Sequence, residues 1–161
     1  MKYLFLVAFT FLAVVAQMIV GNTFFLFNFL DLSLILVAFW AVYRSRTQAL
    51  FVGSMAGLLQ DAVLGWPLGY NGFGKTLAAF VIGQAAKRFN VEGAWLRFAL
   101  MLAASLVNAL SIFLLFLLLQ RSVNVMFLGA SLMQSIITGA AGTLAFAGFD
   151  SYNRAHANKV G

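Results

Sequence analysis

An acid, a base and the only proline of the chain lie in one stretch that interrupts long apolar runs. The stretch covers residues 57–83 and reads GLLQDAVLGWPLGYNGFGKTLAAFVIG, with Asp61 before the interruption and Lys75 after it. Two helices joined by a short turn run antiparallel, so these two side chains can lie at a similar level and form a buried ion pair. The alternative is a proton or ion site, since charged groups within a membrane often mark a pathway. A single acid and base without further acids favours the ion pair.

Pro67 and the glycines around it indicate where the chain reverses direction. Proline stops a helix because it lacks an N–H group, and glycine permits the tight backbone of a turn. We therefore expect one helix to end before Pro67 and another to begin near Tyr70. An irregular segment at membrane depth must be buried in protein or line a wet cavity, because hydrocarbon cannot hydrogen-bond to backbone.

Residues suited to catalysis or metal binding are sparse. His156 is the only histidine and lies in a polar tail, where we expect a solvated side chain. The sequence contains no cysteine, no Ser-His-Asp set, no HExxH motif and no phosphate-binding loop. We expect no catalytic residue, no metal site, no cofactor and no enzyme activity.

The composition indicates an integral membrane protein. Of the 161 residues, 63% are hydrophobic and 9% are charged, whereas soluble domains carry about 25% charged residues. The net charge of +6 does not indicate nucleic-acid binding, because the basic residues are dispersed between apolar runs. We expect membrane lipid to cover the apolar surface.

Spans of about 20 apolar residues predict an all-α fold, a compact bundle of six transmembrane helices that forms one domain over residues 1–161. The predicted spans are 3–20, 24–43, 47–64, 70–86, 95–119 and 126–149. Asp31 lies within the second of them. Either Asp31 caps a helix that follows an interfacial segment 24–30, or its carboxylate is held in the bundle; the sequence favours the cap.

The basic residues predict the orientation of the bundle. Lys75 and Arg121 fall toward one side, and the other eight fall on the opposite side: Lys2, Arg44, Arg46, Lys87, Arg88, Arg97, Arg154 and Lys159. This bias predicts that both termini are cytoplasmic.

Small residues recur at helical spacing in three of the predicted spans. The series are Gly53 and Gly57, Ser105 and Ala109, and Ser131, Ser135 and Gly139. Such faces let helix backbones approach closely within a membrane. They favour packing inside the bundle over docking of a partner's transmembrane helix.

The segment GLLQDAVLGWPLGYNGF, from Gly57 to Phe73, resembles the GLLQD…G.PLG.N signature of the MreD family of rod-shape-determining proteins. The segment DLSLILVAFWA, from Asp31 to Ala41, resembles the family's DLLLILVIYWAL run and is likewise followed by basic residues. Phe73 departs from the small apolar residue usual there, and Lys75 is not a general feature of the family.

The resemblance implies a non-enzymatic scaffold of the bacterial cell-elongation (rod) complex in the inner membrane, which supports cell shape and peptidoglycan synthesis. The implied partners are MreC, RodA, a class B penicillin-binding transpeptidase and, indirectly, MreB. The implied fold is similar to the S components of energy-coupling-factor transporters. We expect the candidate structural and partner-contacting residues to be Asp31, Gly57, Gln60, Asp61, Gly65, Trp66, Pro67, Leu68, Gly69, Asn71 and Lys75.

Two alternative functions follow from the same fold class. A vitamin-binding S component would need a pocket of convergent polar and aromatic groups, for which Trp66, Tyr70, Asn71 and Phe73 are the candidates. A proton-coupled transporter would depend on Asp61. The scarcity of polar outer loops and the single acid–base pair argue against both.

Overall fold

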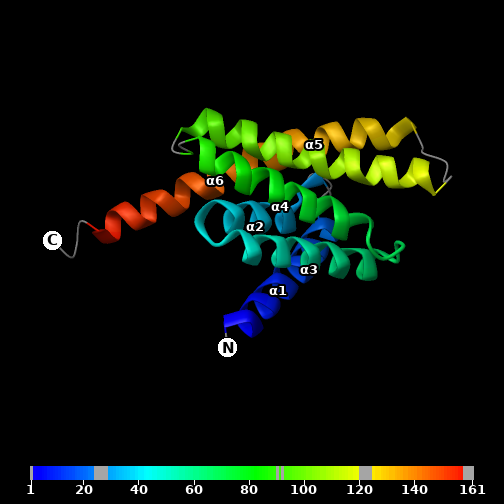
Figure 1. The fold of residues 1–161 in the computed structure, drawn as a ribbon, viewed down its shortest axis with the longest axis horizontal. Coiled ribbons are helices and arrows are strands. Elements are labelled where there is room, and N and C mark those ends of the chain that lie inside the picture. The colour runs from blue at the N-terminus through cyan, green and yellow to red at the C-terminus, as the bar shows by residue number, and fades with distance from the viewer. Residues whose placement is uncertain (1, 24–28, 90, 92, 120–124, 158–161) are drawn as a thin grey trace.

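The computed structural model describes residues 2–23, 29–89, 91, 93–119 and 125–157. Within these ranges the chain is all-α, with six helices and no strand (Figure 1). The helices are α1 (Lys2–Thr23), α2 (Leu32–Tyr43), α3 (Arg46–Leu64), α4 (Tyr70–Arg88), α5 (Ala94–Leu118) and α6 (Val125–Ala157).

Local capping explains where the second helix begins. Of the two alternatives for the segment 24–43, the structure confirms the one that the sequence favoured, in which the helix begins after Asp31, because α2 starts at Leu32. The Asp31 side chain accepts a hydrogen bond from the Leu34 backbone N–H at 2.9 Å, which caps α2 at its first turn. Residues 24–28, which were predicted to lie along the interface, are outside the described residues.

The turn between α3 and α4 depends on two glycines with positive φ. The α3 helix ends at Leu64 with Gly65 (φ 66°) as its C-cap, and α4 begins after Gly69 (φ 109°). Side chains with a Cβ are strained in this region of backbone space, so glycine is favoured at both positions. The predicted helix end before Pro67 and restart near Tyr70 are confirmed.

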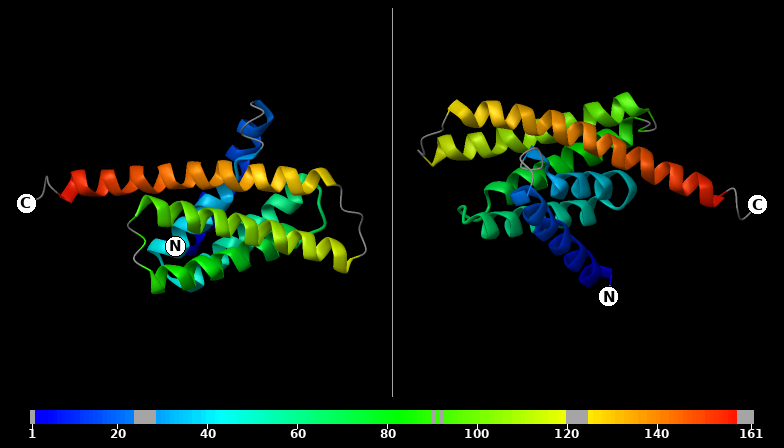
Figure 2. Two further views of the ribbon diagram at one scale, coloured as in Figure 1. Left: turned by 90° about the horizontal axis from the view of Figure 1, so that it is seen from above. Right: turned by 180° about the vertical axis from the view of Figure 1, so that it is seen from behind.

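The α2 helix contacts each of the other five helices. The α4 helix packs against α2, α3 and α5, while α6 runs along α5 and α1 packs on α2 and α3. Figure 2 shows that the C-terminal end of α6 projects beyond the other helices. We call the end that carries residues 65–69 the turn end. The opposite end, with exposed Arg44, Lys87 and Arg88, is the basic end.

A core of small and branched apolar side chains joins the helices. Its buried members are Leu34, Val37, Ala38, Ala41, Ala49, Val52, Ala56, Ala78, Ala79, Ile82, Met101, Ala104 and Phe146. The many alanines allow helix axes to approach closely, which favours association where no hydrophobic force acts between helices.

The lengths of the helices support some of the predicted spans and not others. Two segments are long and apolar enough to cross a membrane, Ala94–Leu118 and Gly129–Tyr152. The 12 residues of α2 extend over only about 18 Å, less than the roughly 30 Å of a hydrocarbon core. Six complete spans therefore remain a prediction.

Candidate functional site

Asp61 closes the turn between α3 and α4. Its side chain is fully buried and accepts hydrogen bonds from the backbone N–H groups of Gly69 (2.9 Å), Asn71 (3.1 Å) and Gly72 (3.4 Å). The Asn71 side-chain amide donates a further bond at 2.8 Å. The first N–H groups of a helix have no partner within it and carry partial positive charge. Asp61 therefore caps α4 from the neighbouring helix.

Glycines bring the two helices of this hairpin together. A Cβ added at Gly57 would overlap the Asn71 backbone, and one added at Gly53 would lie 2.8 Å from the Lys75 carbonyl oxygen. Real Cβ atoms do not tolerate such contacts with backbone. The pair of glycines therefore serves packing inside the bundle, as the sequence favoured.

Serines serve the same purpose between α5 and α6. Ser135 donates a hydrogen bond to Ser105 at 3.1 Å, and both are buried. Gly139 lies against Phe98, which leaves no free space for a larger residue there. This small-residue face is likewise internal.

Lys75 pairs with Asp31, so the predicted ion pair with Asp61 is wrong. Both partners are almost completely buried. Lys75 Nζ donates to Asp31 Oδ2 and, at 2.6 Å, to Ser33 Oγ, which in turn donates to Asp31 Oδ1 at 2.6 Å. The register of the hairpin explains the error. Lys75 lies level with Gly53, about two helical turns from Asp61.

Asp31 is both a helix cap and a charge held in the bundle, so the two alternatives for this residue combine. Its backbone N–H donates to Thr138 Oγ1 of α6 at 3.1 Å, and Gln17 of α1 accepts from the Ser33 N–H at 3.2 Å. We call the buried residues Asp31, Ser33, Lys75 and Thr138, together with the half-buried Gln17, the polar centre. It joins α1, the start of α2, α4 and α6.

The other candidate residues lie around these two carboxylates or on the turn. Gln60 is half-buried, with Oε1 3.4 Å from Ser33 Oγ. The turn residues Gly65, Trp66, Pro67 and Leu68 are exposed, with Leu68 at 70% and Trp66 at 37%. The turn thus forms an outward surface above a buried polar scaffold.

The four residues proposed for a vitamin pocket do not converge. Tyr70 and Asn71 are buried, and the Tyr70 ring packs on Phe116 with centroids 4.9 Å apart. Trp66 contacts the same Phe116 ring, with centroids 6.1 Å apart. Asn71, however, donates to the buried Asp61, and Phe73 is exposed, so the four side chains do not line one binding site.

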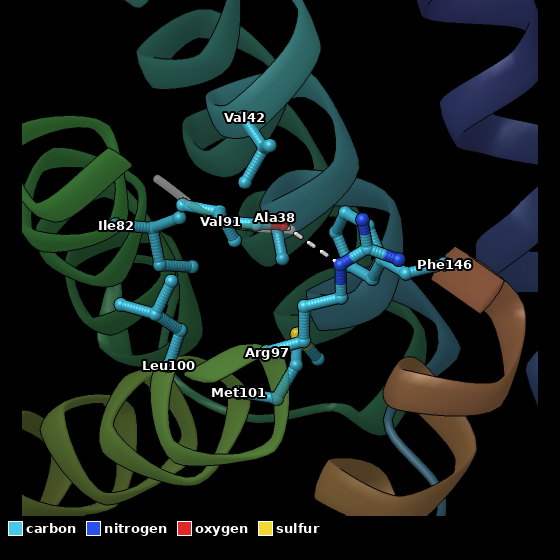
Figure 3. A pocket seen from close by; sticks show the side chains of 8 residues that line it. All are labelled: Ala38, Val42, Ile82, Val91, Arg97, Leu100, Met101 and Phe146. Carbon is cyan, nitrogen blue, oxygen red and sulfur yellow. Dashed lines mark hydrogen bonds between the residues drawn. The ribbon is translucent and has the colours of Figure 1, made fainter. Parts of the chain in front are cut away.

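A third polar cluster lies at the basic end. The sequence did not predict it, because Arg97 was used only to predict the orientation of the bundle. Arg97 is buried; its Nε donates to the Val91 carbonyl at 2.9 Å and its Nη2 donates to Asp150. Tyr43 donates to the same carboxylate at 2.7 Å. Arg97 lies beside apolar side chains around a cavity (Figure 3). The cavity has a volume of about 10 Å³, room for about one water.

These clusters have groups suited to holding the helices in place. The carboxylate oxygens of Asp31 and Asp61 accept several hydrogen bonds each from within the protein. In the part of the chain that the structure describes, no group of three or more His, Asp or Glu residues could hold a metal ion. The clusters fix helix positions, and the exposed turn beside Asp61 is the surface they hold in place.

Comparison with known proteins identifies the family. The family model for the rod shape-determining protein MreD matches residues 1–146. No curated protein and no solved structure matches the chain significantly. The match includes both buried carboxylates of the candidate site and ends before Asp150. The chain therefore belongs to the MreD family, a membrane protein family of rod shape determination that is not known as an enzyme family.

Proposed function

We propose that the protein is a non-enzymatic scaffold of the bacterial rod complex, embedded in the inner membrane with both termini in the cytoplasm. Its family supports the role in cell shape. The orientation rests on Arg44, Lys87 and Arg88, which are exposed at the basic end, since cytoplasmic ends carry the excess of Lys and Arg. The turn end then faces the periplasm.

In this arrangement all six helices form one membrane domain over residues 1–161. The 19 residues of α3 and of α4 extend over about 28 Å each, close to the hydrocarbon thickness. The short α2 begins inside the bundle, which hydrocarbon permits only where backbone groups find partners within the protein. Thr138 and Gln17 supply such partners at Asp31 and Ser33. The bundle is similar in kind to the S components of energy-coupling-factor transporters.

The observation that carries the scaffold role is the exposed turn fixed by a buried carboxylate. Asp61 holds the start of α4 through backbone hydrogen bonds, while Leu68 projects into the surroundings. A surface that is ordered before binding loses less entropy when a partner docks. We propose that this turn meets the transmembrane helix of MreC or its periplasmic root. RodA and the class B transpeptidase are further partners, and MreB is reached indirectly.

Crosslinking in cells tests the surface. A photoreactive amino acid at Leu68, which is 70% exposed, should capture MreC. A matched probe at Leu144 of α6, which is 74% exposed, should not. Tyr70 is unsuitable as a probe position because it is buried. Failure of the Leu68 probe to capture MreC, or equal capture from both positions, would contradict the proposed surface.

A further inference from the structure

One side of α4 changes from apolar to cationic along its length. Phe73, Leu77, Phe80, Gln84 and Lys87 are all exposed, and their spacing of three or four residues places them on one face of the helix. The face begins with aromatic and aliphatic side chains near the turn end and finishes with an amide and an ammonium group at the basic end. This sequence of groups matches the order of acyl chain and headgroup in a phospholipid.

Arg46 of α3 adds a fixed cation to the same face. Its guanidinium carbon lies 4.3 Å from the centroid of the Phe80 ring. This distance is within the range of a cation–π interaction, and Phe80 itself is 40% exposed. Gln84 and Lys87 follow Phe80 by one and two helical turns. The stacked guanidinium of Arg46, the first residue of α3, therefore lies about two helical turns before the end of α4.

These cations have no carboxylate to neutralise them among the described residues. Asp31 is paired with Lys75, Asp61 is bound by backbone N–H groups, and Asp150 is paired with Arg97. Neither Arg46 nor Lys87 forms an ion pair in the described part of the chain. Arg97 is buried and paired, whereas Arg46 and Lys87 pair with no carboxylate among the described residues and are therefore candidates to bind an external anion.

We infer that Arg46, Gln84 and Lys87 bind the phosphate of an anionic phospholipid whose acyl chain lies along Phe80 and Leu77. The inference rests on the membrane placement proposed above. A guanidinium matches two phosphate oxygens with two parallel N–H groups, and lysine adds a mobile point charge. Each basic group near an anionic membrane surface contributes about 1 kcal/mol.

Native mass spectrometry of the full-length protein in detergent tests the site. The protein is titrated with phosphatidylglycerol or with phosphatidylcholine of the same acyl chains, and the bound lipid is counted. We expect preferential retention of phosphatidylglycerol. The Arg46→Gln variant should lose about fivefold in its affinity, and addition of Lys87→Gln should bring the loss to roughly 30-fold.

Three controls keep the result interpretable. Arg121→Gln removes the same charge at a position that the sequence places toward the other side, and it should bind phosphatidylglycerol as the wild type does. Phe80→Leu keeps the face apolar but removes the ring beneath Arg46, so it should weaken binding without loss of the fold. Unchanged thermal unfolding of each variant shows that the bundle is intact.

Equal binding of the two lipids by the wild type would overturn the inference, as would unchanged phosphatidylglycerol affinity in the Arg46→Gln, Lys87→Gln variant. Either result leaves the MreC crosslink from Leu68 untouched, because that probe lies at the turn end. Conversely, absence of the crosslink does not alter a lipid preference measured on the purified protein.

Discussion

Asp61 and Asp31 are both buried, but they are stabilised by different kinds of partner from different parts of the chain. The donors to the Asp61 carboxylate lie within 11 residues of it and are backbone or amide N–H groups. The main partner of Asp31 is the Lys75 ammonium, 44 residues away, and its backbone reaches α6 at a distance of 107 residues. One carboxylate closes a local hairpin, and the other holds four distant segments together.

This difference predicts what is disrupted when a partner of either carboxylate is lost. Loss of a neutral donor leaves Asp61 with several others, and the damage stays in the turn. Loss of Lys75 leaves Asp31 as an uncompensated charge in the interior, which is among the most costly changes a protein can suffer. The polar centre should therefore control the stability of the whole bundle, whereas Asp61 should control the order of the turn.

The largest effect is expected for Lys75→Met, which keeps the side-chain volume but removes the cation. The free energy of unfolding should fall by about 3–5 kcal/mol. Reversible unfolding in mixed micelles with increasing dodecyl sulfate measures this change. A loss below about 1 kcal/mol would show that Asp31 is not buried with Lys75 as its partner.

A smaller and local effect is expected for Asp61→Ala. Hydrogen bonds to a charged group contribute about 1.5–3 kcal/mol, so the bundle should be destabilised by about that amount while membrane insertion continues. Amide exchange should accelerate at Gly69, Asn71 and Gly72, and recovery of the complex with MreC should fall. Wild-type cell width together with normal complex recovery would argue against a role for Asp61 in presenting the turn.

The smallest effect is expected for Asp150→Asn at the basic end. Asp150 is 20% exposed, so water can partly replace it beside Arg97, and we expect a loss of about 1 kcal/mol, near the upper end for solvent-exposed pairs and below that for buried ones. The variant should also retain a hydrogen bond from Tyr43. Thermal unfolding should therefore shift less than in Asp61→Ala; a shift as large as that of Lys75→Met would show that Arg97 depends on Asp150 as strongly as Asp31 depends on Lys75.

The sequence was most informative where local backbone chemistry decides the structure. Pro67 and the glycines at 65 and 69 located the turn, and Asp31 was recognised as a cap for α2 because capping depends on near neighbours. The span of 24–43 left two possible starts for the second helix, because apolar residues continue on both sides of Asp31. Apolar composition alone does not show where backbone hydrogen bonding stops.

The partners of the buried charges could not be predicted for a different reason. Asp61 and Lys75 were paired from their positions in the hairpin, but the register set by Gly53 and Gly57 separates them. Which helix packs against α4 at Lys75 depends on the tertiary fold, and the sequence carries no local signal for it. Ser33 and Thr138 were overlooked for the same reason, since their importance arises only when distant helices meet.

A double-mutant cycle on purified protein tests most directly which carboxylate forms the ion pair with Lys75. Lys75→Met is combined with Asp31→Asn in one cycle and with Asp61→Asn in the other, and each coupling free energy is measured by unfolding in mixed micelles. Partners in direct contact couple by about 0.5–3 kcal/mol, so we expect about 2 kcal/mol or more with Asp31 and less than about 0.5 kcal/mol with Asp61. Coupling that is equal, or stronger with Asp61, would contradict the polar centre.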